Sequence, residues 1–504
     1  MAKAVTPGGV CVLGAAVLLF GACAREDGGR TRAARARNVL FLSVDDLGPY
    51  LGCYGSSVVR TPAIDRLAAR GVLFERAYVQ HPVCAPSRAV MMTGRRPDTT
   101  GVRLLKHLYR DALPDAVVLP ELFRLAGYET RSLGKFQHGT GDHDDPLAWS
   151  EPPWRPAGWQ TYYAEPETRD RIAELRSEAA LEGRRLGAHV FASEAPDVED
   201  EKLPDGRTAA QAIAFLAQAH QRPFFLGVGF LKPHLPFVAP KRYWDALPPA
   251  AGDPAANPPP PTHTPPWLTF ELGEPRRFAD VPDEGELGAE LERELVRGYL
   301  ACVAYVDAQI GRVLEALERL DLERNTVVVL WGDNGFHLGD FGLWGKGTPF
   351  EASLRTPLIV SAPGRAAGAR CRRLVEAVDL YPTLAELCGL AAPAELEGTS
   401  FVPLLDDPER PWKRAVFGEA WTHPPEHGAV LARTVRTERY RLIEWAPEGT
   451  QRRLRLLYDY AEHPYESENL AGRPEYDALV EELSWQLHAG WRSALPPPAG
   501  DAGD

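Results

Sequence analysis

Basic residues are in deficit in this chain of 504 residues. It has 56 lysines and arginines against 69 aspartates and glutamates, which gives a net charge of −13 at pH 7. Because nucleic-acid-binding proteins usually present basic surfaces, this balance argues against generalised nucleic-acid binding. An anionic substrate would need a locally basic pocket on an acidic protein. The chain also has no recognisable internal repeat, and its length suits one large domain with a smaller satellite, or two to three domains.

Long apolar runs are absent from the start of the chain, where Val10–Phe20 is too short to span a bilayer comfortably. Gly21-Ala22-Cys23 follows and resembles a bacterial lipoprotein cleavage site. We therefore expect a signal peptide over residues 1–23, with Cys23 as the site of a lipid anchor. The alternative is an ordinary secretory leader that is removed with Cys23. A polar, arginine-rich tether over 24–37 follows, and we expect export to the periplasm, outer membrane or surface of a bacterium.

The chain contains few cysteines, and the number of cysteines beyond the leader is odd. Seven are present, of which the five beyond it are Cys53, Cys84, Cys302, Cys371 and Cys388. In an exported chain, an odd cysteine indicates a free or specially used thiol. The sequence has no Asn-x-Ser/Thr acceptor for N-linked glycosylation.

Strand and helix patterns alternate over most of the chain. Asn38–Val44 is typical of a strand buried on both faces, and Thr61–Ala69 of a helix with Thr61 as N-cap. Further strands are expected at Phe74–Val79, Tyr128–Leu133, Phe224–Phe230 and Thr326–Leu330, and helices at Leu119–Ala126, Thr208–His220 and Ala289–Leu320; Pro357–Val360 and Leu380–Leu387 continue the alternation. This pattern predicts an α/β fold with a large, doubly wound, mostly parallel sheet.

The pattern changes after about residue 400. Short antiparallel strands are expected at Ala415–Ala420, Val430–Val435 and Tyr440–Trp445, and a helix at Tyr476–His488. We therefore predict a main domain over 38–400, a smaller C-terminal α+β subdomain over 401–492 and a tail over 493–504. His143–Leu203 and the proline-rich Pro248–Pro282 resist assignment. They are either loops that shape specificity over an α/β site or surface insertions.

Several chemically active side chains follow predicted strands. Asp45-Asp46, Lys135, the segment around His234, and Asp333 each come after one. Because sites in doubly wound folds lie at the carboxyl ends of the strands, these side chains are expected to meet at one edge of the sheet.

The sharpest motif is Cys84-Ala85-Pro86-Ser87-Arg88, followed by Met92-Thr93-Gly94-Arg95. The four fixed residues of C-x-P-S-R would occur by chance in about one in a thousand chains of this length. Together the two elements resemble the signature of the sulfatase family, the tag recognised by the formylglycine-generating enzyme. The resemblance implies that Cys84 becomes formylglycine, whose hydrated form attacks sulfate and then releases it. The alternative is that Cys84 is a small buried hydrophobic residue.

The resemblance extends roughly from Asn38 to Leu470, and within the family the iduronate-2-sulfatase pattern fits best. The stretches that carry it are Val44–Leu47, Leu51–Gly55, Val83–Thr100, Lys232–Phe237, Tyr299–Asp307, Leu457–Tyr460 and Glu468–Leu470. One departure is Asn334, where that pattern has histidine.

The resemblance also implies a metal site. Asp45, Asp46, Asp333, Asn334 and the modified Cys84 would hold Ca²⁺, since hard oxygen ligands suit that ion. The ion would act as a Lewis acid and a template. Taken alone, such Asp-Asp and Asp-Asn pairs are more often helix caps or turns.

The remaining roles implied by the resemblance belong to cations and histidines. Arg88 would steady the hydrated formylglycine, and Lys135, His234 and Lys346 would bind the sulfate. His234 or Lys346 would protonate the leaving oxygen, and His138 would take the proton that lets the sulfated intermediate collapse.

The predicted activity is therefore sulfate ester hydrolysis on a sulfated carbohydrate, with a 2-O-sulfated uronate as the candidate substrate. Two alternatives stay open. One is a phosphonate or phosphate ester hydrolase on the same scaffold, and the other is a lipoprotein that binds sulfated glycans without catalysis.

Overall fold

The computed structural model describes residue 1 and residues 38–497, apart from short internal stretches. The stretches outside the description are 140–142, 160–162, 182–189, 219, 253–257, 265–273, 283–284, 286, 423–429, 448–452 and 463–464. The expected signal peptide and tether, beyond residue 1, and residues 498–504 of the expected tail lie outside the described residues. Among the residues that are described, no helix is long and apolar enough to cross a membrane. From Arg35 onward the chain forms one unit.

An eight-stranded sheet lies at the centre of the described part of this unit, in the order β11-β2-β10-β7-β1-β5-β3, with β12 beside β2. β1 pairs in parallel with β5 and β7, whereas β10 runs antiparallel to β7 and β2. The strands are β1 (Asn38–Val44), β2 (Val72–Tyr78), β3 (Glu129–Gly134), β5 (Phe224–Phe230), β7 (Thr326–Gly332), β10 (Arg355–Ser361), β11 (Ala369–Cys371) and β12 (Val375–Glu376). The predicted large, mostly parallel sheet is thus confirmed.

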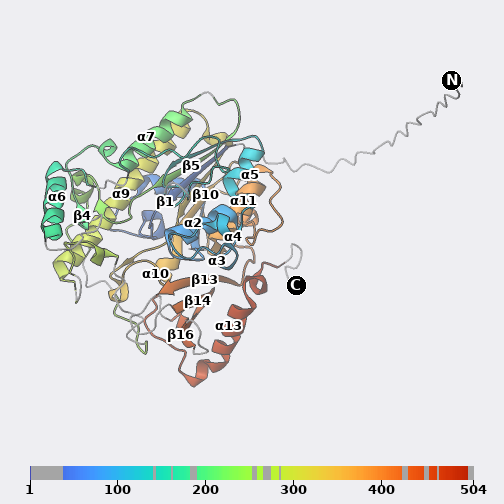
Figure 1. Ribbon diagram of the computed structural model, residues 1–504. Helices are drawn as coiled ribbons and strands as arrows, with labels where there is room; N and C mark the ends of the chain where they lie inside the picture. The colour runs from blue at the N-terminus through green and yellow to red at the C-terminus, as the bar shows by residue number, and fades with distance from the viewer. Residues whose placement is uncertain are drawn as a thin grey trace. The chain divides into compact units, whose positions relative to one another are not determined.

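Helices cover both faces of the sheet (Figure 1). Along β1, Leu40 and Leu42 pack into one layer and Val39 and Phe41 into the other, because successive side chains of a strand point to opposite faces. The first layer contains α1 (Pro62–Arg70), α7 (Pro204–Leu216) and α9 (Ala289–Arg319), and the second contains α2 (Cys84–Thr93), α5 (Leu119–Leu125) and α11 (Leu380–Cys388). Every residue of β1 is buried, as expected for a strand covered on both faces.

Two helices of the layers on the central sheet, α7 and α2, differ from the sequence prediction. α7 begins and ends four residues before the predicted Thr208–His220, because Pro204 occupies its first turn and His220 instead folds back onto the carbonyl of Phe215. α2 was not predicted as a helix. It holds the Cys84 motif and ends at Gly94, whose φ of 63° is the left-handed conformation that glycine adopts readily.

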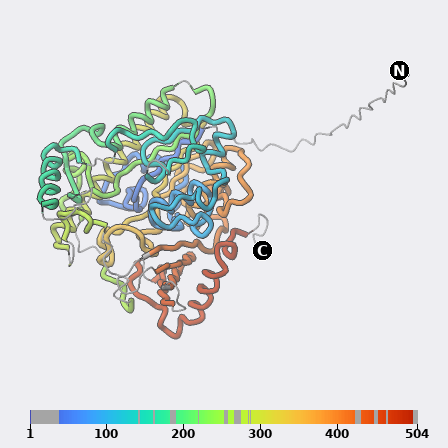
Figure 2. The backbone as a smooth tube through the Cα atoms, in the orientation of Figure 1, coloured from blue at the N-terminus to red at the C-terminus, as the bar shows by residue number. Residues whose placement is uncertain are grey.

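A second, antiparallel sheet follows in the order β13-β14-β15-β16. Its elements are β13 (Ala415–Thr422), β14 (Val430–Thr437), β15 (Tyr440–Pro447), β16 (Leu454–Asp459) and α13 (Asp477–Ala489). Leu483 and Leu487 of α13 pack with Val435, Leu442 and Leu457 of the sheet. This block, red in Figure 2, is the predicted C-terminal α+β subdomain, with β16 as a strand that sequence analysis missed.

The two unassigned stretches contribute little regular structure. The first contains α6 (Pro166–Leu181) and β4 (Ser193–Glu194), and β4 pairs with β6 (Phe237–Val238), directly after the His234 segment. The second contains the 3-10 helix η6 (Pro275–Arg277). Other short elements are α3 (Pro97–Thr100), α4 (Tyr109–Ala112), α8 (Lys241–Asp245), α10 (Glu351–Leu354), α12 (Val402–Asp406), β8 (His337–Leu338), β9 (Trp344–Gly345), η1 (Gly52–Tyr54), η3 (Asp200–Lys202), η7 (Glu323–Asn325), η8 (Asp340–Gly342), η9 (Ala377–Asp379), η10 (Pro474–Tyr476) and η11 (Trp491–Ala494).

Candidate active site

The carboxyl ends of β1 and β7 bring three aspartates together. Val44 and Gly332 are partners in the parallel register, so the residues that follow them are neighbours. The backbone N–H of Asp46 donates to Oδ1 of Asp333 at 3.0 Å. One carboxylate oxygen from each of Asp45, Asp46 and Asp333 lies within 4.8 Å of the other two, and all three residues are fully buried. The predicted meeting of the two acidic segments at one edge of the sheet is therefore seen.

Asp46 adopts a left-handed backbone conformation, with φ of 60°. This conformation is uncommon outside glycine and is maintained only where surrounding contacts favour it. Tyr299, on α9, provides such contacts because its hydroxyl donates to the carbonyl of Asp46 at 2.8 Å and accepts from the N–H of Gly48 at 2.8 Å. The role of Tyr299 cannot be inferred from the sequence, since nothing in its local pattern shows that it reaches β1.

Cys84 is the first residue of α2 and is 2% exposed. Its Sγ lies 3.4 Å from Nζ of Lys346 and 3.8 Å from Nζ of Lys135. Burial and the nearby Asp45 together raise the pKa of the Cys84 thiol well above its ordinary value, and the two lysines offset this only in part. The unmodified side chain is therefore a neutral thiol rather than a reactive thiolate.

Arg88 lies one turn along α2 from Cys84, and its guanidinium is directed toward the carboxylates. Nε donates to Oδ2 of Asp333 at 2.8 Å, and Nη2 lies 3.4 Å from Oδ1 of Asp45. Nη1 donates to the carbonyls of Lys135 and Phe136. Arg88 thus balances two buried carboxylates while it holds the segment after β3 against α2.

The predicted cations gather around the same carboxylates. Lys135 forms an ion pair with Asp45, and Nζ of Lys346 donates to Oδ2 of Asp46 at 2.6 Å. Nδ1 of His234 donates to the carbonyl of Leu235 at 2.6 Å, which leaves Nε2 facing Asp46 at 3.9 Å. Burial and the charge of Lys346 lower the pKa of His234 to about 3, so its ring is neutral.

The protonation of the aspartates reflects this crowding. Burial by itself would raise the pKa of Asp45, but Lys135 and the other nearby cations outweigh it and hold the pKa well below its ordinary value. Burial raises the pKa of Asp333 to about 7 despite the nearby Arg88, because Asp45 and Asp46 add their negative charge. Three carboxylates forced together in this way favour a bound cation, whose charge would stabilise their ionised forms.

Asn334 supplies a test of whether a metal ion fits here. Its Nδ2 donates to Oδ1 of Asp46 at 2.7 Å, whereas its Oδ1 is buried and has no hydrogen-bond partner. A buried amide oxygen without a partner is costly and calls for an explanation. With the three carboxylates, it makes a set of hard oxygen donors suited to a divalent cation such as Ca²⁺ or Mg²⁺.

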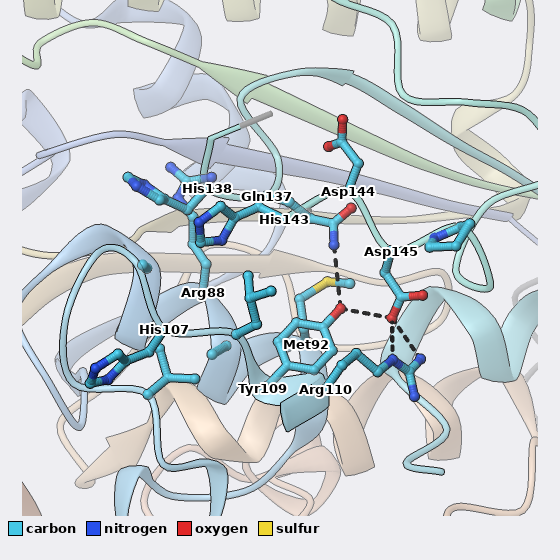
Figure 3. A pocket seen from close by; sticks show the side chains of 15 residues that line it. Arg88, Met92, His107, Tyr109, Arg110, Gln137, His138, His143, Asp144 and Asp145 are labelled. Carbon is cyan, nitrogen blue, oxygen red and sulfur yellow. Dashed lines mark hydrogen bonds and ion pairs between the residues drawn. The ribbon is translucent and has the colours of Figure 1, made fainter. Parts of the chain in front are cut away.

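His138 lines, together with Arg88, a pocket against α2 (Figure 3). Its Nδ1 is buried without a hydrogen-bond partner, and burial together with Lys135 lowers its pKa to about 3. Within the described residues it makes no hydrogen bond with Cys84. In the same pocket, Tyr109 accepts from Gln137 at 3.4 Å and donates to Asp145 at 2.8 Å.

Two acidic residues near the site, Glu274 and Asp205, were not identified from the sequence. Oε1 of Glu274, from the proline-rich stretch, lies 3.7 Å from Nε2 of His234 and 3.9 Å from Nζ of Lys346. Asp205 accepts from the N–H groups of Leu231 and Lys232, each at 2.8 Å. Nζ of the buried Lys232 donates to the carbonyls of His234 and Pro236, so these contacts hold the segment that presents His234. No local sequence signal distinguishes Glu274 and Asp205 from ordinary surface or core positions, whereas Lys232 belongs to the Lys232–Phe237 motif.

Within the described residues, the five cysteines beyond the leader form no disulfide. Four of them, Cys84, Cys302, Cys371 and Cys388, are buried. Cys84 lies among charged groups, whereas Cys371 and Cys388 pack in the second hydrophobic layer and Cys302 in the first. The expectation of a specially placed thiol therefore agrees with the position of Cys84.

Comparison with protein families gives two matches. The family model described as "Sulfatase" covers residues 37–390, and a model described as "N-sulphoglucosamine sulphohydrolase, C-terminal" covers residues 339–492. The first match includes all the residues of the cluster around Cys84.

Individual proteins agree with the family match. The iduronate 2-sulfatase of Mus musculus is 34% identical over 406 residues, which cover 73% of this chain and 72% of that protein. A sulfatase of Formosa agariphila is 30% identical over 464 residues, which cover 88% of this chain and 85% of that protein. Among solved structures, a phosphonate monoester hydrolase from Silicibacter pomeroyi superposes with a TM-score of 0.71 over 91% of this chain and 96% of that one, at 24% identity, a similarity of fold.

Proposed function

The chain belongs to the sulfatase family and is a sulfuric ester hydrolase, and on that premise we propose that it removes sulfate from a sulfated carbohydrate. The observation that carries the proposal is the position of Cys84. Its sulfur lies within hydrogen-bond reach of Lys135 and Lys346, beside three clustered carboxylates. This is the arrangement that a transferring anionic group needs, with a nucleophile, positive charge against its oxygens and a site for a cation.

The proposed nucleophile is a formylglycine made from Cys84 by the formylglycine-generating enzyme. Hydrated formylglycine would attack the sulfate and afterwards expel it from the same carbon. Because burial and Asp45 raise the pKa of the Cys84 thiol, the unmodified side chain would be a poor nucleophile. Cys84 also opens α2 within the C-A-P-S-R motif that the maturing enzyme would read.

The proposed metal ion is Ca²⁺, held by Asp45, Asp46, Asp333 and Asn334, with the modified Cys84 as a further ligand. The unpartnered Oδ1 of Asn334 and the clustered aspartate oxygens support this assignment. When bound, calcium would polarise a sulfate oxygen and fix its position.

The proposed roles of the other groups follow from their positions. Arg88 would steady the nucleophile while it compensates Asp333. Lys135, His234 and Lys346 would bind the sulfate oxygens, and the negative charge of the bound sulfate would favour a proton on Nε2 of His234, whose ring is neutral without it. His234 or Lys346 would then protonate the leaving oxygen. His138, which is neutral and has an unpartnered Nδ1, would accept the proton that releases sulfate.

A 2-O-sulfated uronate is the proposed substrate, on the strength of the iduronate 2-sulfatase of Mus musculus at 34% identity. We also propose export, with Cys23 as a lipid anchor in the periplasm, outer membrane or cell surface. Labelling of the protein by a radioactive fatty acid in cells, and its loss in Cys23→Ala, would test the anchor.

The first experiment is mass spectrometry of the tryptic peptide Ala77–Arg88, from protein made together with a formylglycine-generating enzyme. The expected result is replacement of the thiol sulfur of Cys84 by an aldehyde oxygen. Cys84→Ala is expected to lose turnover of sulfate esters and keep its fold. Cys388→Ala, which removes a buried thiol on α11, is the matched control and should stay active. An unmodified Cys84, or full activity in Cys84→Ala, would contradict the mechanism.

A phosphonate or phosphate ester hydrolase is the second candidate, because the phosphonate monoester hydrolase from Silicibacter pomeroyi shares the fold over 91% of this chain. Turnover of phenyl sulfate, phenyl phosphate and the monophenyl ester of methylphosphonate by the same preparation would separate the two. A higher kcat/KM for the sulfate is expected, and the reverse order would favour the second candidate.

A further inference from the structure

Glu274 brings a carboxylate into the site from a segment that the proposed mechanism does not use. It lies directly before η6, in the proline-rich stretch 248–282. Its Oε1 is 3.7 Å from Nε2 of His234 and 3.9 Å from Nζ of Lys346, the two groups proposed to protonate the leaving oxygen. Glu274 therefore adjoins the side of the site from which the leaving group departs.

The exposure of the side chains shows which side of the site is open. The side chain of Asp46 is fully buried and that of Lys346 is 9% exposed, whereas those of His234 and Glu274 are 22% and 21% exposed. A sulfate held near Cys84 would lie on the buried side of the site, beside Asp46 and Lys346. The alcohol to which it is esterified would extend past His234 and Glu274, because theirs are the more exposed side chains of this series.

The chemistry of a carbohydrate ester fits this geometry. The ester oxygen would hydrogen bond to Nε2 of His234 or Nζ of Lys346. A hydroxyl on the carbon next to the sulfated one lies about one hydrogen-bond length from the ester oxygen. Since both proton donors are within 4 Å of Glu274, that neighbouring hydroxyl falls within reach of its carboxylate. A carboxylate is acceptor-only when ionised, so it would receive the hydroxyl proton.

We propose that Glu274 is a specificity-determining residue that accepts a hydrogen bond from the free hydroxyl next to the sulfated carbon of the leaving group. The proposal rests on the sulfatase function proposed above and deepens it by naming the substrate class, sulfate esters with an adjacent free hydroxyl. Hydrogen bonds to charged groups contribute more than neutral ones, and a site built for a hydroxyl discriminates strongly against analogues that lack it.

Two other roles for Glu274 make different predictions. It lies with Asp46 and His234 in a group that could hold a cation, so it could act as a metal ligand. Its side chain also fills the space beside Gly345 where a Cβ would lie, and it could simply hold Lys346 in place. Either role would act on the common machinery and change the turnover of every ester alike.

The test compares 2-hydroxyphenyl sulfate with phenyl sulfate, which differ by one hydroxyl next to the ester. Sulfate release is measured by ion chromatography, and the ratio of the two kcat/KM values is compared between wild type and variants. In Glu274→Ala the ratio is expected to fall about tenfold to a hundredfold. Glu274→Gln keeps a neutral acceptor and should retain an intermediate ratio. Glu290→Ala, at an exposed position in the first turn of α9, is the control and should leave the ratio unchanged.

Each outcome has a distinct meaning. An unchanged ratio in Glu274→Ala overturns this proposal and leaves the sulfatase function intact. An equal fall for both esters also overturns it, and weaker Ca²⁺ binding by calorimetry would then identify a metal ligand. A wild type that releases sulfate from neither ester overturns the proposed function and this inference together.

Discussion

Glu376→Gln is expected to remove a component of stability that depends on pH. Glu376, at the end of β12, is 1% exposed and accepts two hydrogen bonds from Arg96, at 2.8 and 2.6 Å, and one from Lys413, at 2.7 Å. It also accepts from the backbone N–H of Phe417 at 3.1 Å. The cluster therefore joins the segment after α2 to the start of β13.

The magnitude follows from the shift in protonation. Burial would raise the pKa of Glu376, but Arg96 and Lys413 outweigh it and lower the pKa from 4.5 to about 2. Because the folded pKa is the lower one, its stabilisation is fully present above pH 4.5 and is lost as the pH falls toward 2. A shift of this size corresponds to about 3 kcal/mol. That is an upper value, because the neighbouring Asp379 can partly replace Glu376. Burial and the negative charge of Glu376 raise the pKa of Asp379. Once position 376 is neutral, Asp379 would ionise more readily and its charge would balance that of Lys413.

The assay is urea unfolding followed by circular dichroism at pH 7.0, 5.5 and 4.0, with wild type and variant side by side. Glutamine resembles the protonated acid, so the variant should be less stable by up to about 3 kcal/mol at pH 7. The difference should shrink as the pH falls below 4.5. Glu386→Gln, at an exposed position on α11, is the control and should change stability by less than about 0.5 kcal/mol. A Glu376→Gln effect as small as the control's, or one that does not vary with pH, would refute the reasoning.

Three further predictions concern the site. Asn334→Ala should weaken Ca²⁺ binding in calorimetry about tenfold or more, and equal affinity in variant and wild type would exclude Asn334 as a ligand. Chelation of the ion from the wild type should lower its Tm, because at a Ca²⁺ concentration of one hundred times Kd the bound ion contributes about 2.7 kcal/mol to the free energy of unfolding. Lys232→Met, which removes two bonds to the segment of His234, should lower kcat while Ca²⁺ affinity is kept. Tyr299→Phe should lower the free energy of unfolding by about 1–2 kcal/mol and weaken Ca²⁺ binding, because the carbonyl of Asp46 loses its hydrogen-bond donor. Unchanged Ca²⁺ binding would show that Asp46 keeps its left-handed conformation without this hydrogen bond.

Patterns of apolar residues predicted the central layers of the fold. β1 and β5 have the predicted bounds, because a short, near-continuous apolar run is typical of a strand that is buried on both faces. α2 was missed because its first turn contains a proline and its motif has no amphipathic period. All ten of its residues are buried, so no polar face marks it as a helix.

The candidate site was predicted where a motif or a strand end marked it. The C-x-P-S-R motif identifies Cys84 and Arg88, and the rule that parallel strands end at one edge brings Asp45, Asp46 and Asp333 together. The sequence by itself thus determined the sheet, the nucleophile candidate and the acidic cluster, because these depend on local pattern and on topology.

Only the tertiary structure decided which distant side chains complete the site. Tyr299 reaches Asp46 from the middle of a long helix, and Glu274 reaches His234 from a stretch without periodicity. The unpartnered oxygen of Asn334 and the neutral thiol of Cys84 likewise depend on what surrounds them. Hydrogen bonding, burial and charge are properties of the packed neighbourhood, and residues more than two hundred positions apart in the chain create that neighbourhood here.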